Sequence, residues 1–290
     1  MFARACVFLV FSATAFCQQS PDNADWHKPF PRFRIVGNLY YVGTYDLACY
    51  LITTPQGHIL VNTGMPDSVA MIQANVESLG FKMSDIKILT ATHGHIDHVA
   101  GMAQLKRITG AKLMMSELDA ALLEDGGKSD FRFGDDADMH FEPVKVDQTF
   151  KDGEKISLGG VELTAHGHPG HTKGATSFTM NIAEEGRTYR VGIVNMGSIN
   201  PGVFVSGMPG YPGIREAYAR TFHDQNEMQI DIWLASHAAQ FDMHGKFKPG
   251  DPYDPNRFMD PDGFHAAVKR LETTYREHLY AELGAEKMGQ

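Results

Sequence analysis

Residues 93–98 constrain this chain more than any other stretch, because they hold four possible metal ligands within six positions. These ligands are His93, His95, Asp97 and His98, in the pattern H-x-H-x-D-H. Imidazole and carboxylate are the ligands of zinc sites that keep a position open for water, whereas structural zinc sites use mostly cysteine. Four ligands so close in sequence cannot easily converge on one tetrahedral ion and leave room for a substrate. We therefore expect two adjacent ions, each completed by a ligand from elsewhere in the chain.

The predicted secondary structure places this segment at the end of a strand. Residues 86–92 form a short apolar run typical of a buried strand, and a helix is predicted from about residue 97 to residue 108. Ligands bind in α/β folds where loops converge beyond the ends of strands. Asp97 would also lie near a helix N-terminus, where a negative charge is favoured.

The missing ligands should be single histidines in loops that follow later strands. His237 comes directly after the apolar strand predicted at residues 232–234. Another loop carries His166, His168 and His171, and position alone does not choose among these three. We interpret the other histidines as ordinary exposed or packed residues, namely His27, His58, His140, His223, His244, His265 and His278.

Strand and helix patterns alternate along the rest of the chain without a linker. The predicted strands cover residues 33–42, 49–54 and 58–61 (a hairpin), short runs within 144–165, then 177–182, 189–194 and 231–235. The predicted helices cover residues 67–79, with Asp67 as the cap, then 213–229 and 261–283. This alternation predicts one layered α/β domain over residues 20–290, with sheets inside and helices outside.

The N-terminus has the pattern of a secretory signal peptide. Arg4 precedes an apolar run at residues 5–16 that is too short to span a bilayer, and a polar break begins at Gln18. We expect residues 1–19 to be removed and the mature chain to be periplasmic, without a membrane partner. The alternative is a buried N-terminal helix. Cys17 fits a lipoprotein signal poorly because Phe16 precedes it.

Composition narrows the class of partner. Of 290 residues, 43% are hydrophobic, enough to bury a sizeable core, and the net charge is −9. An acidic chain argues against a nucleic-acid partner, because binding a phosphate backbone needs clustered Lys and Arg. Cys49 would be the one cysteine left after cleavage, and it lies in an apolar strand, which predicts a buried thiol.

From about residue 30 to about residue 285 the chain resembles the metallo-β-lactamase superfamily. The resemblance rests on residues 59–64 (I-L-V-N-T-G), the H-x-H-x-D-H segment, Gly170-His171-Thr172 and Ser236-His237. It implies a four-layer αβ/βα sandwich, with two mixed sheets packed face to face and helices outside. It also selects His171 among the three histidines of its loop.

Two absences narrow the resemblance further. Glyoxalase II and lactonase relatives generally place a metal-bridging Asp one strand after the Gly-His-Thr turn, and the first subclass of true β-lactamases has a Cys ligand at this place. Here the region at residues 193–198 reads I-V-N-M-G-S and has neither. Having neither resembles the third subclass of class B β-lactamases. Residues 38–48, 126–130 and 250–253 are similar to the GOB-type enzymes of that subclass.

Three positions depart from these relatives. GOB-type enzymes carry Gln at the position of His93, so His93 restores a third nitrogen ligand at the first site. Most of the subclass has Ser where this chain has Met196, and a thioether is a poor zinc ligand, so we expect Met196 to pack. Asn62 replaces an Asp that is frequent in the hairpin motif.

The resemblance implies a small-molecule β-lactam substrate, two Zn²⁺ ions, a monomer, and hydrolysis of the lactam amide bond by a metal-bound hydroxide. Such an enzyme confers resistance to penicillins, cephalosporins and, by expectation, carbapenems. The first ion would be held by His93, His95 and His171. The second ion would be held by Asp97, His98 and His237, and Asp97 would also orient the attacking oxygen.

The substrate contacts and the reaction leave alternatives. Ser198 and Lys128 are candidates for binding the substrate carboxylate, although each is equally compatible with an ordinary loop residue. The alternative function is another zinc hydrolase of the same fold, such as a lactonase or a glyoxalase II-like thioesterase. A third possibility is a binding protein with a decayed site, which the presence of all six ligands disfavours.

Overall fold

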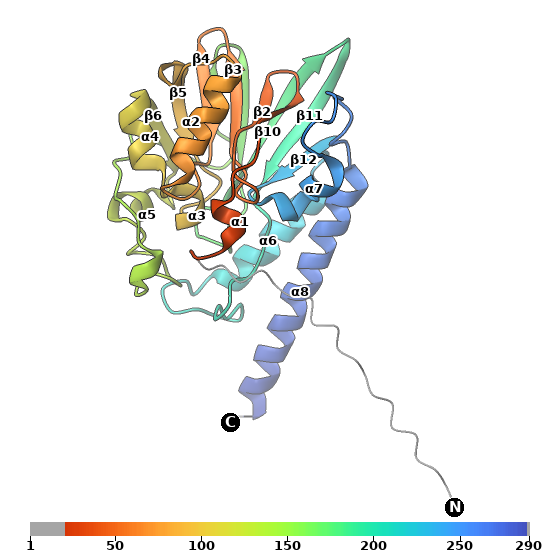
Figure 1. Cartoon of the computed structure of the whole chain (residues 1–290). Coiled ribbons are helices and arrows are strands. Elements are labelled where there is room, and N and C mark those ends of the chain that lie inside the picture. The colour runs from red at the N-terminus through yellow and green to blue at the C-terminus, as the bar shows by residue number, and fades with distance from the viewer. Residues whose placement is uncertain (1–20, 289–290) are drawn as a thin grey trace, which may run out of the picture.

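The computed structural model describes residues 21–288, so the expected signal peptide at residues 1–19 lies outside the described part of the chain. Two β-sheets pack face to face, and helices cover the outer face of each sheet (Figure 1). This is the four-layer αβ/βα sandwich that the resemblance implies.

The first sheet has seven strands in chain order, antiparallel from β1 to β4 and parallel from β4 to β7. Its strands are β1 (Phe33–Val36), β2 (Leu39–Tyr41), β3 (Tyr50–Thr54), β4 (Gly57–Val61), β5 (Ile86–Thr90), β6 (Lys112–Ser116) and β7 (Gln148–Phe150).

The second sheet has five strands in the order β12-β11-β10-β9-β8. Strand β12 runs parallel to β11, and the other neighbours are antiparallel. Its strands are β8 (Lys155–Leu158), β9 (Val161–Gly167), β10 (Thr176–Glu184), β11 (Arg187–Val194) and β12 (Ile232–Ala235).

The central strands of the first sheet are buried on both faces, which explains their continuous apolar sequences. In β3, Tyr50 and Ile52 belong to the core between the two sheets, whereas Leu51 packs on the helix side. The same alternation places Ile59 between the sheets and Leu60 under the helices. Side chains alternate between faces at every residue of a strand, so one apolar run serves both cores.

Helices α2 (Ser68–Ser78) and α4 (Met102–Thr109) cover the first sheet through buried side chains, and α6 (Ile214–Glu227) and α8 (Pro261–Met288) cover the second. The shorter helices are α1 (Ala24–His27), η1 (Met83–Asp85), α3 (Ile96–Val99), α5 (Ala120–Asp125), η2 (Ala137–Met139), η3 (Ala238–Phe241) and α7 (Met243–Lys246). Between residues 21 and 288, no helix combines the length and the apolar character that crossing a bilayer requires.

Two predicted elements are wrong because a glycine interrupts each of them. The predicted strand at residues 33–42 is a tight hairpin, in which Phe33 pairs with Tyr41 and the chain reverses at Gly37 with a φ of 52°. The predicted helix at residues 97–108 is divided into α3 and α4. Its hydrogen-bond ladder breaks at Gly101, whose N–H donates to the carbonyl of Gly64 at 3.1 Å.

The start of α2 is confirmed, but Asp67 does not act as predicted. Asp67 occupies the N-cap position without making a side-chain capping bond. Its carboxylate instead pairs with His27 Nδ1 at 2.7 Å and so ties α2 to the N-terminal segment. The carboxylate of Asp67 is therefore used for the ion pair with His27 and not for capping the helix.

Candidate metal centre

The site lies where strands of both sheets end. The segment His93–His98 follows β5 and leads into α3, and its four candidate ligands are buried. His171 lies in the loop after β9, and His237 directly follows β12. The fold therefore brings together side chains from both sheets that are far apart in sequence.

His93, His95 and His171 form one group of possible ligands. One ring nitrogen of each lies within 4.8 Å of those of the other two, and His95 Nδ1 lies 3.2 Å from His171 Nε2. Zinc–nitrogen bonds are about 2.0–2.1 Å long, so nitrogens at such separations can surround one ion.

Asp97, His98 and His237 form a second group beside the first. Asp97 Oδ2 lies 3.1 Å from His98 Nε2 and 3.3 Å from His237 Nε2. His93 also lies within 4.8 Å of Asp97 and His98 through its ring nitrogen, so the two groups adjoin each other. The structure thus juxtaposes all six side chains that the sequence singles out.

The chemistry of these groups fits metal ions. His93 Nε2 is buried without a hydrogen-bond partner within residues 21–288, and the buried Asp97 Oδ2 and His98 Nε2 lie near only other candidate ligands. Buried polar atoms nearly always have hydrogen-bond partners, so this arrangement needs an explanation. Ligation of a metal by nitrogen and carboxylate oxygen supplies one.

Burial and neighbouring charges set the protonation of the ligands. Burial lowers the pKa of His171 to about 3 and also depresses the pKa of His93 and His98, which keeps their nitrogen lone pairs free. Burial alone would raise the pKa of Asp97, but His98 and His237 hold that pKa well below its usual range.

His95 and His237 differ from these three histidines. Burial alone would lower the pKa of His95, but the hydrogen bond and charge of Asp130 raise it. The pKa of His237 is raised in the same way. Burial alone would lower its pKa, but the carboxylates of Asp46 and Asp97 raise the pKa of His237 to about 10. A metal ion at this group must displace the proton on Nε2, the nitrogen that faces Asp97, since metal ligands bind in their deprotonated form.

Asp46 is a site residue that sequence reasoning missed. Its Oδ2 accepts a hydrogen bond from His237 Nδ1 at 2.9 Å, and its Oδ1 accepts one from the N–H of Ala239 at 3.1 Å. A carboxylate behind a ligating histidine fixes the ring and its tautomer, so that Nε2 of His237 faces Asp97. Asp46 lies in the turn before β3, where no local pattern marks it.

Asp119 was also missed, and it joins the two ligand loops. Its buried carboxylate accepts hydrogen bonds from the N–H of Gly94 at 3.0 Å, from Thr172 Oγ1 at 2.6 Å and from the N–H of Gly174 at 2.7 Å. A Cβ at Gly174 would lie 2.6 Å from the Asp119 nitrogen, so this approach requires glycine. Asp119 thereby fixes the loop of His93 and His95 against the loop of His171.

Asn62 holds the start of the His93–His98 segment through hydrogen bonds. Its Oδ1 accepts a hydrogen bond from the N–H of Thr92 at 3.0 Å, and its Nδ2 donates one to the carbonyl of Ala48 at 3.2 Å. An aspartate could not make the second bond when ionised, because a carboxylate only accepts. Thr92 also shares a 2.8 Å hydrogen bond with Ser236, which connects the two sheets beside the ligands.

The other residues singled out in the sequence lie outside the two ligand groups. His166 bonds Thr179, and His168 bonds Ser177. The carbonyl of Ser198 accepts a hydrogen bond from His171 Nδ1 at 2.9 Å, whereas Lys128 is exposed on the loop after α5. Met196 is buried in the core between the sheets, as expected for packing.

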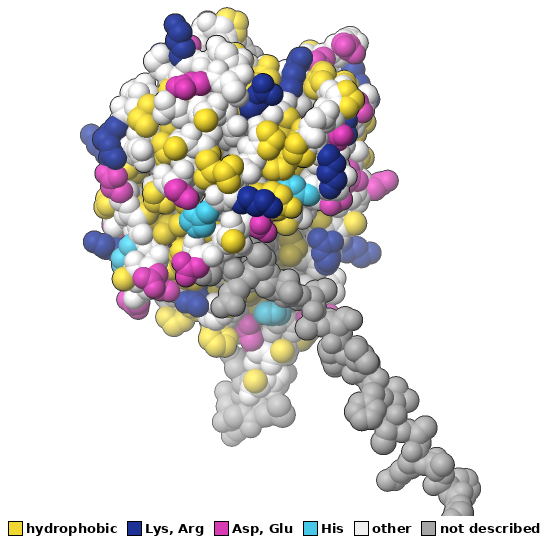
Figure 2. All heavy atoms as spheres, in the orientation of Figure 1, with side chains coloured by type: hydrophobic (Ala, Val, Ile, Leu, Met, Phe, Trp, Pro, Cys, Tyr) yellow, Lys and Arg dark blue, Asp and Glu magenta, His cyan; other side chains and the backbone are white. Residues whose placement is uncertain are grey.

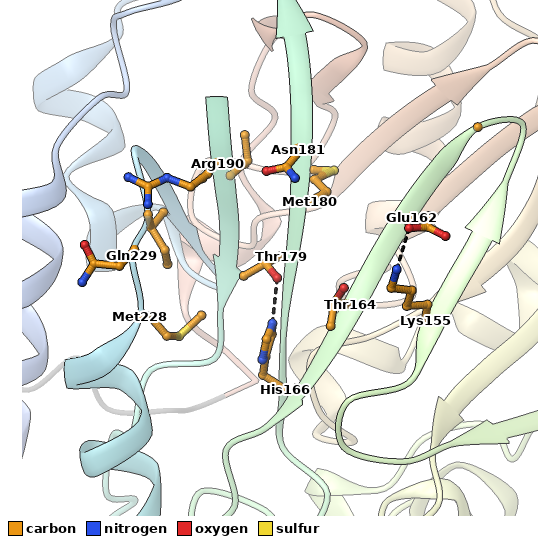
Figure 3. A pocket seen from close by; sticks show the side chains of 13 residues that line it. Lys155, Glu162, Thr164, His166, Thr179, Met180, Asn181, Arg190, Met228 and Gln229 are labelled. Carbon is orange, nitrogen blue, oxygen red and sulfur yellow. Dashed lines mark hydrogen bonds and ion pairs between the residues drawn. The ribbon is translucent and has the colours of Figure 1, made fainter. Parts of the chain in front are cut away.

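A cavity of about 430 Å³ lies on the outer face of the second sheet, and none of the six candidate ligands lines it (Figure 3). Its charged side chains are paired, Lys155 with Glu162 inside the cavity and Arg190 with Asp231 beside it. His166 bonds Thr179 on its floor. With its charges neutralised internally, the cavity has no evident ligand chemistry of its own.

On the face shown in Figure 2, Lys and Arg are interspersed with Asp and Glu. No continuous basic stripe crosses that face, which agrees with the net charge of −9.

Comparison with known proteins identifies the family. The model of the metallo-β-lactamase superfamily matches residues 44–183. A class B3 di-zinc metallo-β-lactamase, LRA-12 from an Alaskan soil metagenome, is 49% identical, with a TM-score of 0.87 over 90% of this chain and 99% of that one. The chain belongs to the metallo-β-lactamase superfamily.

Within that superfamily, solved structures of class B3 enzymes are similar over nearly their whole length. GOB-18 from Elizabethkingia meningoseptica is 44% identical, with a TM-score of 0.87 over 92% of this chain and 100% of that one. Curated relatives match over shorter stretches. The hydroxyacylglutathione hydrolase GloC of Haemophilus influenzae is 36% identical over 32% of this chain and 44% of its own length. The chain spans about half the length of several curated relatives that it matches.

Proposed function

We propose that this protein is a zinc-dependent β-lactamase that hydrolyses the amide bond of penicillins, cephalosporins and carbapenems and so confers resistance to them. The observation that carries the proposal is the paired ligand groups in one buried centre, His93, His95 and His171 beside Asp97, His98 and His237. The similarity of the whole chain to class B3 enzymes in sequence and fold supports this choice of substrate.

Two zinc ions held by these groups would supply Lewis-acid polarisation of the lactam carbonyl and an acidified water as the nucleophile. The protein's part is to hold the ligands in the required state. Burial keeps His93, His98 and His171 neutral, and Asp97 remains ionised beside His98 and His237. An ionised Asp97 can accept a hydrogen bond from the attacking water and orient it.

Apolar packing shields one flank of the centre from bulk water. Trp26, Met65, Ile96 and Phe133 belong to one buried cluster, and the Trp26 ring lies 5.9 Å from that of His237. Water exclusion strengthens every electrostatic interaction inside a site.

Substrate binding completes the proposal. We assign recognition of the β-lactam carboxylate to Ser198, which adjoins His171, and long-range attraction to the exposed Lys128. A rim cation raises the association rate more than it changes the chemical step. We also propose export to the periplasm, where β-lactams meet their targets, and action as a monomer.

A thioesterase or lactonase is the competing function, because curated hydroxyacylglutathione hydrolases match part of the chain. Residues 193–198 lie in the region where those relatives generally place a bridging carboxylate, and they contain none. Asn195 in this segment is buried with its amide nitrogen unpaired among the described residues. Without that carboxylate, the site resembles the class B3 pattern more closely.

The deciding experiment assays purified protein with zinc, and again after chelation, against a chromogenic cephalosporin, a penicillin, a carbapenem, a lactone and S-lactoylglutathione. Zinc-dependent turnover of the β-lactams is expected. Turnover confined to the lactone or the thioester would overturn the proposal in favour of the competing function, and zinc binding without turnover of any of them would refute both.

A further inference from the structure

The loop at residues 126–134, between α5 and η2, holds a carboxylate in one fixed direction. Asp130 Oδ1 accepts hydrogen bonds from the N–H groups of Arg132 at 2.8 Å and Phe133 at 2.7 Å. The Asp130 carbonyl also accepts the N–H of Gly134 at 3.0 Å. A carboxylate held through one oxygen by two backbone donors cannot rotate freely, so its second oxygen points in a defined direction.

That second oxygen faces a candidate metal ligand. Asp130 Oδ2 lies 3.3 Å from His95 Nε2, and both side chains are 4% exposed. Neither atom makes a hydrogen bond to any other group within residues 21–288. The other nitrogen of the same ring, His95 Nδ1, faces His171. The imidazole of His95 therefore lies directly between the loop and the first ligand group.

The loop also contacts the segment that follows β11. Arg132 Nε donates to the carbonyl of Pro201 at 2.7 Å, and the Phe131 ring lies 5.1 Å from that of Tyr211. Phe133 packs edge-on against His95, with ring centroids 5.3 Å apart. Any displacement of the loop would thus move the partner of His95.

We propose that Asp130 is a positioning residue that accepts the proton of His95 Nε2, leaves Nδ1 to bind metal, and couples the order of the 126–134 loop to metal affinity at the first site. Coupling of this kind is reciprocal, so metal binding at the first site should also order the loop. The role is distinct from that of Asp46, which supports the second group.

The test is Asp130→Asn in the full mature protein. The amide oxygen can still accept from Arg132 and Phe133, but the group facing His95 becomes an N–H₂ donor, which favours the wrong tautomer. Loss of such a carboxylate partner lowers metal affinity about 10–100-fold. Competition titration with a chromogenic chelator should show this loss at one of two zinc sites, with the other nearly unchanged.

Asp136→Asn is the matched control, because Asp136 caps η2 in the same region, through the N–H of Asp138 at 3.2 Å, and is exposed. It should bind zinc like the wild type. Unchanged first-site affinity in Asp130→Asn, or an equal loss in both variants, would overturn the proposal.

Two further readouts separate positioning from simple structural support. The cobalt-substituted wild type should show an exchangeable imidazole N–H resonance from His95 that Asp130→Asn loses. Zinc should slow amide exchange at residues 131–134 in the wild type and do so less in the variant; equal slowing in both would contradict the coupling. These measurements need metal but no substrate, so a wild type that binds zinc yet hydrolyses no β-lactam would refute the proposed function alone. A wild type that binds no zinc would refute both.

Discussion

The carboxylate of Asp46 holds the imidazole of His237 through a 2.9 Å hydrogen bond that spans 191 residues of sequence. The bond leaves Nε2 of His237 directed at Asp97 and gives the second ligand group its shape. This relationship shows how much of the centre depends on residues that do not themselves reach a metal.

Asp46→Asn should therefore weaken the second metal site selectively. The amide oxygen can still accept the N–H of Ala239, so the turn should persist, but His237 loses its anionic partner. We expect about a 10–100-fold loss of zinc affinity at one site, measured by zinc titration. Asp67→Asn, which removes an exposed carboxylate paired with His27, is the control and should bind zinc normally. Equal zinc binding by Asp46→Asn and the wild type would contradict this role.

His93→Gln should keep the fold and weaken the first site, because an amide is a poorer metal ligand than imidazole and His93 belongs to both ligand groups. Circular dichroism should be unchanged, while bound zinc per chain and β-lactam turnover should fall. His223→Gln, on the exposed face of α6, gives a matched control. If zinc stoichiometry and activity survive the His93 substitution, the assignment of His93 as a ligand is wrong.

Asp119→Asn should cost stability as well as activity. The carboxylate accepts three hydrogen bonds in a buried position, and an amide nitrogen must face at least one of those donors. A buried donor left without its acceptor costs about 1–3 kcal/mol, measurable as a lower free energy of unfolding in urea. Glu117→Gln, which removes an exposed partner of Lys151, should be neutral. A neutral Asp119→Asn would show that the two ligand loops are held together by other contacts.

Removal of metal should destabilise the folded protein. Chelation leaves His93 Nε2 buried without a partner, and leaves Asp97 with only its ion pairs to His98 and His237. Zinc at about 100 times its dissociation constant adds about 2.7 kcal/mol to the free energy of unfolding, provided that it binds only the folded state. Thermal unfolding should show a lower Tm with chelator and recovery on adding zinc, with a smaller recovery in Asp97→Asn. A Tm that does not respond to zinc would exclude binding at this centre.

Much of the fold could be predicted from sequence, because periodicity and burial coincide in most of its elements. The hairpin of β3 and β4 and the helices α2, α6 and α8 occur where they are predicted. The two errors have different causes. Gly37-Asn38 is a local two-residue turn signal inside an apparently continuous strand, and the sequence prediction overlooked it. Gly101 donates to Gly64 inside an apparently continuous helix, and this tertiary contact has no signature in a local window of sequence.

The convergence of the candidate ligands could be predicted for a similar reason. A dense cluster such as His93–His98 requires further ligands, and these should follow the ends of strands. His237 is one histidine in such a place, and the turn at Gly170-His171 provides another. Whether all six bind zinc remains a prediction. Asp46, Asp119 and Asp130 could not be found, because each is a single acidic residue in a loop whose partner is set only by the packing of distant segments.

The bond between Thr92 and Ser236 joins positions 144 residues apart, next to the candidate ligands His93 and His237. An unfolded chain offers a metal ion only the short H-x-H-x-D-H segment. Contacts between such distant positions form after the intervening chain has paid its entropic cost of closure. The complete centre therefore exists only when the two sheets are packed, and an ion bound by residues from both sheets would link positions separated by almost half of the polypeptide.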